Sequence, residues 1–149
     1  MGSRKIEQKS FAQELIKNLS NKKKIIPSKF HYDLKGSRYF EKITKTKEYY
    51  VTRVEKQILN EISGQINKIF GNNLTFVEFG SGSNKKINKF IKSLSEPKEY
   101  IPIDISREYL FENASIIAKK FSDLKVTAIC ADFSQTNRLN KILKKKKKK

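Results

Sequence analysis

The sequence predicts an α/β fold in which a parallel sheet follows a mostly helical first half. From residue 74 onward, short apolar runs alternate with amphipathic stretches in the order strand, helix, strand, helix, strand. This alternation is typical of a parallel sheet with right-handed crossovers. The first apolar run ends in the turn Gly80-Ser81-Gly82, and a Lys-rich helical pattern follows it. We therefore expect an N-terminal helical region over 1–73 and a sheet domain over 74–139.

Two helices of the first half are expected to begin with a capping box, in which Ser or Thr is followed three residues later by Gln or Glu. Ser10 opens a helix that we expect over 10–19. Thr52 opens a longer helix that is expected to end at Gly71. A short helical stretch is also expected after Gly36. Apolar residues recur at helical spacing in each of these segments.

The sheet domain is expected to contain three strands, over 74–79, 100–105 and 125–130. A helix over 84–94 follows the first strand, and Ser106 is the expected N-cap of the helix after the second. Beyond the third strand the alternation of strands and helices is no longer clear. A weak helical pattern of apolar residues is followed by a run of six lysines, and the residues concerned are Leu139, Ile142, Leu143 and Lys144 to Lys149.

The 149-residue chain is strongly basic, with a net charge of +18. We expect the Lys-rich segment 140–149 to be solvated and disordered, as charge runs usually are. Our preferred interpretation is that the reading frame was lost in an A-rich tract, so that the chain is a truncated form. A charged tail for an anionic partner is the alternative.

Composition also indicates a class of protein. The single cysteine, Cys130, cannot form an internal disulfide, which fits a reducing cytosol. No segment approaches the roughly 18 apolar residues that a membrane span needs. The basic charge would attract nucleic acid non-specifically, but no recognition motif accompanies it. We expect a cytoplasmic monomer with no membrane partner and no specific nucleic-acid partner.

Three expected strand ends carry glycine or acidic residues. Gly80 and Gly82 follow the first strand, Asp104 ends the second, and Asp132 follows the third. Because the carboxyl ends of parallel strands line one crevice, these residues are expected to converge there. Each acid also has a plain structural interpretation, since Asp104 could cap the helix beside Ser106 and Asp132 could be a turn residue.

Taken together, the glycines and acids favour an adenosine cofactor. Asp104 could accept hydrogen bonds from both ribose hydroxyls. Asp132 could accept one from the adenine amine while the Phe133 ring packs on the base. A dinucleotide site is disfavoured because Lys85 stands where the third glycine of G-x-G-x-x-G is required.

S-adenosylmethionine (SAM) fits the loop better than a nucleotide does, because it has adenosine and a carboxylate but no phosphate. No Gly-Lys-Ser/Thr sequence is present, so a phosphate-binding P-loop is disfavoured. Glu78 before the loop and Lys86 after it would suit the amino and carboxylate ends of this cofactor.

The segment 30–44, FHYDLKGSRYFEKIT, resembles the start of the histidine-specific Nα-methyltransferase family of ergothioneine biosynthesis. Val51 departs from the family pattern, which usually has proline after the Tyr-Tyr pair. The resemblance extends from about Pro27 to Phe133. Further segments that carry it are 48–53, 78–83, 102–106 and 131–133.

The resemblance implies a class I methyltransferase fold with a Rossmann-like sheet, SAM as cofactor and histidine as substrate, whose α-amine would receive three methyl groups. It implies aromatic positions near the substrate and the methyl group for Tyr32 and Tyr49, which could otherwise be core aromatics. It assigns no catalytic residue and no metal site. The cofactor-binding positions that it implies are Gly80, Lys86, Asp104, Asp132 and Phe133.

Family members continue well past this point, with further strands and a substrate-recognition insertion that have no counterpart here. We therefore expect most of a cofactor half-site rather than a complete enzyme. Two other interpretations stay open, namely a basic nucleic-acid-binding protein that kept the fold and a remnant without function.

Overall fold

The computed structural model describes the backbone of residues 3–133 and the side chains of residues 11–133. The chain divides into two compact units, Met1–His31 and Tyr32–Lys149. The second unit confirms the predicted α/β fold with a parallel sheet. Within residues 3–133, no helix is both long enough and apolar enough to cross a membrane. The weak helical pattern near Leu139, the end of the sheet domain at 139 and the Lys-rich segment lie outside the described residues.

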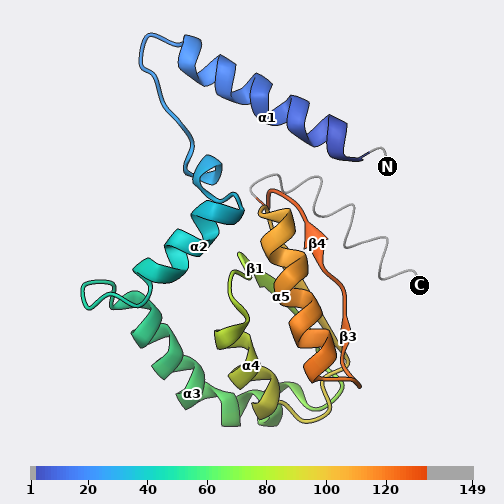
Figure 1. The fold of residues 1–149 in the computed structure, drawn as a ribbon. Helices are drawn as coiled ribbons and strands as arrows, with labels where there is room; N and C mark the ends of the chain where they lie inside the picture. The colour runs from blue at the N-terminus through green and yellow to red at the C-terminus, as the bar shows by residue number, and fades with distance from the viewer. Residues whose placement is uncertain (1–2, 134–149) are drawn as a thin grey trace. The chain divides into compact units, whose positions relative to one another are not determined.

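The first unit contains helix α1, Ser3–Ser20, and the short 3-10 helix η1, Ser28–His31 (Figure 1). Phe30 of η1 meets Phe11 of α1 edge-on, with 4.9 Å between ring centroids. Lys29 pairs with Glu14 at 2.7 Å. The prediction that a helix begins at Ser10 is wrong, because the preceding residues are mostly Arg, Lys, Glu and Gln, which favour helix and extend it backward.

The second unit opens with helices α2, Leu34–Ile43, and α3, Val51–Phe70. Helix α2 begins before Gly36, because the Asp33 side chain accepts a hydrogen bond from the Gly36 N–H at 2.6 Å and caps the first turn. Thr52 lies inside the first turn of α3, so the expected capping box does not form there. The predicted end of α3 is confirmed at Gly71, which has the left-handed φ of +73°.

The sheet contains β1, Thr75–Phe79, and β2, Glu99–Asp104, which run parallel with Phe79 opposite Ile103. The third expected strand is interrupted at residues 127–128. It forms β3, Lys125–Val126, and β4, Ile129–Cys130, both parallel to β2. Strand β2 therefore lies in the middle of the sheet, with β1 on one side and β3 and β4 on the other.

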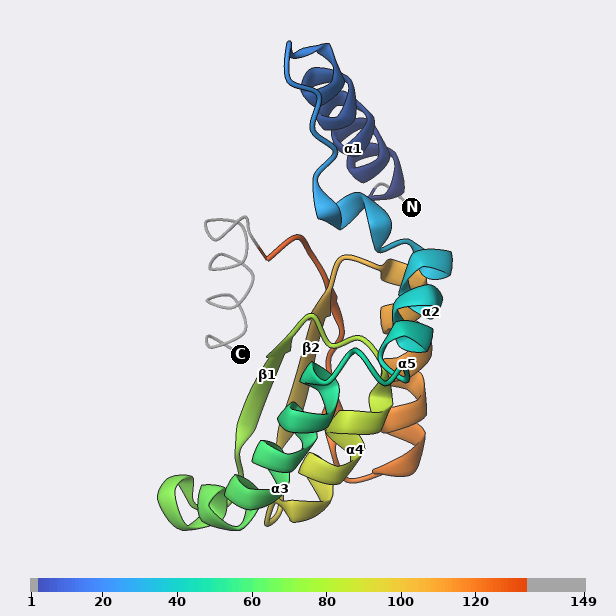
Figure 2. The same cartoon turned by 90° about the vertical axis from the view of Figure 1, so that its left-hand side faces the viewer.

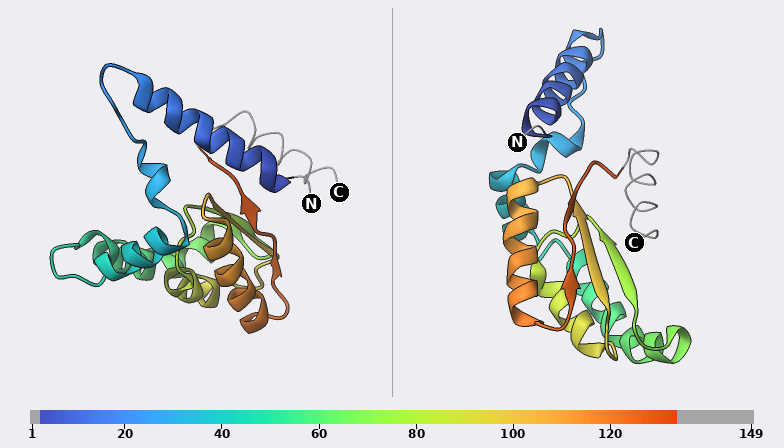
Figure 3. Two further views of the ribbon diagram at one scale, coloured as in Figure 1. Left: turned by 45° about the horizontal axis from the view of Figure 1, so that its top comes forward. Right: turned by 90° about the vertical axis from the view of Figure 1, so that its right-hand side faces the viewer.

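Helices α4, Asn84–Ser93, and α5, Arg107–Lys120, connect the strands. Together with α3 they lie on one side of β1 and β2 (Figures 2 and 3). The core between these helices and the sheet includes the stacked rings of Phe76 and Tyr100, whose centroids are 5.0 Å apart. Its buried members are Ile87, Ile91, Tyr100, Ile117 and Leu124.

A second apolar cluster consists of Ile101, Ile103, Ile129 and Ala131. Ile101 and Ile103 alternate along β2 with Tyr100, so they point to the opposite face of the sheet. Ile103 is fully buried. Both faces of β2 are therefore packed, which explains why this strand is apolar almost throughout.

The cap of α2 gives a direct stability prediction. Asp33→Ala is expected to destabilise the second unit by about 1 kcal/mol, because the Gly36 N–H loses its acceptor. Ser83→Ala is the matched control, since Ser83 is the N-cap of α4 and makes no side-chain capping hydrogen bond. Thermal unfolding followed by circular dichroism measures both variants. Equal melting temperatures for the two variants would contradict the capping role of Asp33.

Candidate functional site

The loop after β1 depends on two glycines in left-handed backbone conformation. Gly80 has φ +65° and Gly82 has φ +48°, a region that disfavours residues with a Cβ. A Cβ at Gly80 would still lie 3.9 Å from the Phe133 ring, so conformation rather than space is what requires glycine there. The Gly80 N–H donates to the Ile103 carbonyl at 2.8 Å, which ties the loop to the end of β2.

Asp104 links this loop to the start of α5. The Gly82 N–H donates to its Oδ2 atom at 3.3 Å, and the Ser106 N–H donates to its Oδ1 atom at 2.8 Å. Each carboxylate oxygen has about two lone-pair positions, so each can accept a further hydrogen bond. Ser106 is the N-cap of α5, as predicted, but its buried hydroxyl has no hydrogen-bond partner among residues 3–133.

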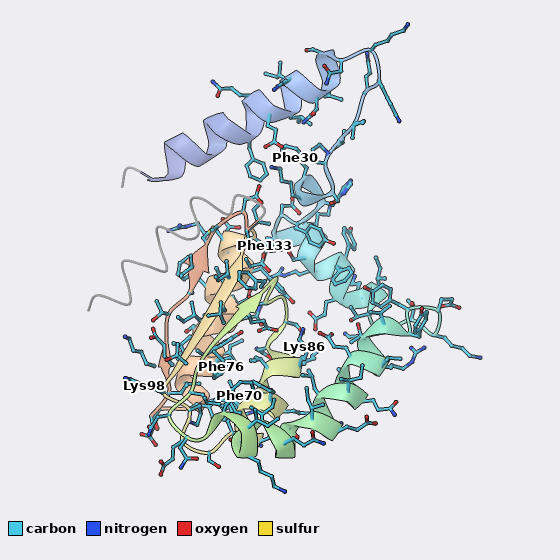
Figure 4. All side chains as sticks on the ribbon, turned by 180° about the vertical axis from the view of Figure 1, so that it is seen from behind. Phe30, Phe70, Phe76, Lys86, Lys98 and Phe133 are labelled. Atoms are coloured by element: carbon cyan, nitrogen blue, oxygen red, sulfur yellow. The ribbon has the colours of Figure 1, made fainter. Side chains whose placement is uncertain are left out.

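The segment after β4 continues the same rim. The Ala131 N–H donates to the Asp104 carbonyl at 3.0 Å, and half-buried Asp132 is the next residue. The Phe133 ring, labelled in Figure 4, lies edge-on to Phe79, and ring centroids are 5.9 Å apart. The structure thus brings Phe133 close to the glycine loop, and it brings Gly82 to Asp104.

Lys86, in the first turn of α4, lies between two carboxylates. Its Nζ is 2.9 Å from Glu55 Oε1 on α3 and 3.3 Å from Glu78 Oε1 on β1. The Tyr100 hydroxyl donates to the other Glu78 oxygen, Oε2, at 2.6 Å. Glu78 and Lys86, expected at opposite ends of a ligand, therefore pair with each other.

Burial and charge shift the pKa values of this pair. Burial raises the pKa of Glu78, and this effect outweighs the hydrogen bond from Tyr100 and the charge of Lys86. Burial opposes the charge of Lys86, but the hydrogen bond to Glu55 and the charge of Glu78 outweigh it and raise the Lys86 pKa. Lys86 is therefore a fully charged cation near neutral pH.

Tyr32 and Tyr49 belong to an aromatic cluster around α2. Both meet Phe40 edge-on, with centroid distances of 6.0 Å for Tyr32 and 5.7 Å for Tyr49. Glu41 of α2 joins this helix to the sheet domain, because it pairs with Lys85 at the start of α4 and accepts from the Tyr109 hydroxyl of α5 at 3.4 Å. The two tyrosines therefore lie on a segment that is anchored beside the glycine loop.

The pH dependence of stability should distinguish Glu78 from Glu41, because the pKa values of these two carboxyl groups shift in opposite directions. The Glu78 pKa lies above its usual 4.5, so its contribution is largest below pH 4.5 and is lost as pH rises through the folded-state pKa. The hydrogen bond from Lys85 lowers the Glu41 pKa, so its contribution is present above pH 4.5 and is lost as pH falls through the folded-state pKa. Urea unfolding at a series of pH values from acid to neutral tests both assignments. Glu78→Gln should remove a decline in the free energy of unfolding as pH rises above 4.5. Glu41→Gln should remove an increase in the free energy of unfolding as pH rises toward 4.5. An unchanged profile in Glu78→Gln would contradict this assignment.

Sequence reasoning missed Glu55, Tyr100 and Glu41 as parts of this region. An acid inside an apolar strand was a usable signal, because a buried carboxylate needs donors nearby. Glu78 is such an acid, and its donors come from the neighbouring strand β2 and from α4. Glu55 and Glu41 lie on helices whose packing against α4 and α5 is tertiary, so no local pattern marks them.

A family model described as histidine-specific, SAM-dependent methyltransferase matches residues 11–149, most of the chain. The chain belongs to this family. The parallel sheet described above is what the family resemblance led us to expect.

Curated relatives agree with the family assignment. The chain is 30% identical over 126 residues to a histidine N-alpha-methyltransferase of Mycobacterium tuberculosis, covering 83% of this chain and 39% of that protein. It is 33% identical over 115 residues to the protein of the same name from Mycolicibacterium smegmatis, covering 75% of this chain and 36% of that protein. It is 31% identical over 88 residues to ergothioneine biosynthesis protein 1 of Neurospora crassa, covering 57% of this chain and 10% of that protein. The chain thus spans less than two fifths of the length of the curated relatives it matches.

Proposed function

We propose that this chain binds SAM at the glycine loop and contributes this cofactor site to methyl transfer onto the α-amine of histidine. The observation that carries the proposal is the hydrogen bond from the Gly82 N–H to Asp104 at 3.3 Å, which joins the loop and the acid at one rim. Membership of a SAM-dependent family supports the cofactor. The names of the mycobacterial relatives support histidine as the substrate.

The residues at the rim fit the chemistry of this cofactor. Asp104 has spare acceptor capacity on both oxygens for the two ribose hydroxyls. Asp132 would accept from the adenine amine, and the exposed Phe133 ring would pack against the base. A Cβ at Gly80 would lie 3.9 Å from the Phe133 ring, so the ring that would pack on the base is within van der Waals reach of the glycine loop.

The charged end of the cofactor would meet Lys86, whose ammonium can receive a carboxylate. When bound, SAM would supply a methyl group on a sulfonium, and a neutral amine can attack this methyl in line as the thioether leaves. Tyr32 and Tyr49 would lie near the amino-acid substrate and would orient its amine. Such positioning can supply much of the rate of a displacement between two bound groups.

Cofactor binding is the part of the proposal that this chain can be tested for directly. Isothermal titration with SAM and with S-adenosylhomocysteine is expected to give saturable one-to-one binding, and ATP is the control because it carries phosphates instead of the amino acid. Mass spectrometry of histidine incubated with the chain and SAM tests methyl transfer. Absence of heat with both sulfur nucleosides would contradict the proposal.

The net charge of +18 supports one alternative, a basic protein that binds nucleic acid. A gel shift with RNA at physiological salt tests it. A shift that persists at that salt, combined with no heat from SAM, would favour the alternative. A cytoplasmic monomer stays a prediction, and sedimentation of the purified chain tests its oligomeric state.

A further inference from the structure

We propose that Glu78 and Tyr100 are positioning residues that hold the Lys86 ammonium in place to receive the carboxylate of the ligand. This inference rests on the proposed function, because it concerns the amino-acid end of the same cofactor. It assigns a role to two buried side chains of the sheet that the proposed contacts with ribose and base do not use.

Both Glu78 oxygens have donors within the protein, and burial gives a ligand little access to their remaining lone pairs. Tyr100 donates to Oε2 at 2.6 Å, and Lys86 lies 3.3 Å from Oε1. The Glu78 side chain is 13% exposed, so few water molecules can replace either partner. Its arrangement suits a fixed anchor for a cation better than a ligand-binding group.

Lys86 needs such an anchor because its side chain is long and flexible. Fixing a lysine side chain costs rotamer entropy, and this cost weakens ligand binding unless contacts within the protein already hold the side chain. The ammonium has three N–H donors. Glu78 and Glu55 take up two of them, which leaves one donor for an incoming carboxylate.

Tyr100 makes the anchor rigid. Its ring is 2% exposed and stacks on Phe76 with an interplanar angle of 21°. The hydroxyl is therefore held at a fixed point of the core and fixes the Glu78 carboxylate in turn. Glu55 differs, because its side chain is 47% exposed on α3 and can exchange its contact with Lys86 for water.

The ligand pair S-adenosylhomocysteine and 5′-methylthioadenosine tests this chain of contacts. Both carry the thioadenosine, but only the first carries the amino acid with its carboxylate. Tyr100→Phe keeps the stacked ring and removes the hydroxyl. We expect it to weaken S-adenosylhomocysteine about threefold to tenfold, less than the direct loss of a hydrogen bond to a charged group, because the effect reaches the ligand only through Lys86. Binding of 5′-methylthioadenosine is expected to stay unchanged.

Two further variants make the test specific. In a Lys86→Met background, Tyr100→Phe should cause no additional loss, because the positioning acts through Lys86. Tyr109→Phe is the matched control, since its hydroxyl contacts Glu41 rather than Glu78. It should leave the ratio of the two affinities unchanged.

Equal weakening of both ligands by Tyr100→Phe would overturn the inference, because it would indicate a purely structural role. A loss for S-adenosylhomocysteine that persists in the Lys86→Met background would also overturn it. If the unmodified chain bound neither ligand, the proposed function would fail first and this inference with it. Thermal melting of each variant checks that the fold is kept.

Discussion

Asp104→Ala is expected to reduce SAM affinity at least about 100-fold, because two charge-assisted hydrogen bonds to the ribose would be lost at about 1.5–3 kcal/mol each. The substitution also removes the acceptor for the Gly82 and Ser106 N–H groups. The glycine loop and the start of α5 would therefore loosen together. Isothermal titration measures the affinity, and circular dichroism measures the fold.

Asp104→Asn separates the two roles of this side chain. The amide keeps one oxygen as an acceptor and nearly the same shape, so it should retain more of the fold than alanine does. Its affinity for SAM is expected to fall between those of the unmodified chain and Asp104→Ala. Affinity that is unchanged in Asp104→Ala would refute the assignment of Asp104 to the ribose.

Ile103→Ala is expected to destabilise the second unit by about 2–5 kcal/mol, the usual cost of truncating a buried aliphatic side chain. Ile103 lies in the middle strand of the sheet and is 0% exposed. It packs with Ile101, Ile129 and Ala131. Its carbonyl also accepts from the Gly80 N–H at 2.8 Å. Because this carbonyl holds the glycine loop, Ile103→Ala should also weaken cofactor binding.

Val77→Ala on β1 is the matched control for that experiment. Val77 faces Ile101 across the β1–β2 pair, but it is 39% exposed and loses less contact when truncated. Urea unfolding should show a clearly smaller change for Val77→Ala than for Ile103→Ala. Similar changes in both variants would contradict the packing described for β2.

Local signals predicted the elements that local chemistry determines. The α4 helix and the end of α3 follow from apolar periodicity and from Gly71, whose φ of +73° a residue with a side chain rarely adopts. The capping boxes failed because helix formers upstream of Ser10 extend α1, and Tyr50 takes the N-cap position of α3. Helix starts depend on neighbours that the pattern S/T-x-x-E/Q does not include.

Tertiary contacts explain what the sequence could not predict. The break between β3 and β4 occurs where Thr127 donates its N–H to Tyr100 and its hydroxyl contacts Glu99. Such pairing depends on β2 being alongside, so a run of apolar residues does not reveal it. The Glu78–Lys86 pair was missed for the same reason, because α4 must fold back onto β1 before the two side chains meet.

The carboxylate of Asp104 accepts from amides in two segments that are remote in the chain, Gly82 and Ser106. Anything that draws electron density from this carboxylate will alter the chemical environment of both amide protons at once. The two nuclear magnetic resonance signals should therefore move in step during a titration. Two amides can then report occupancy of the rim without any label on the ligand.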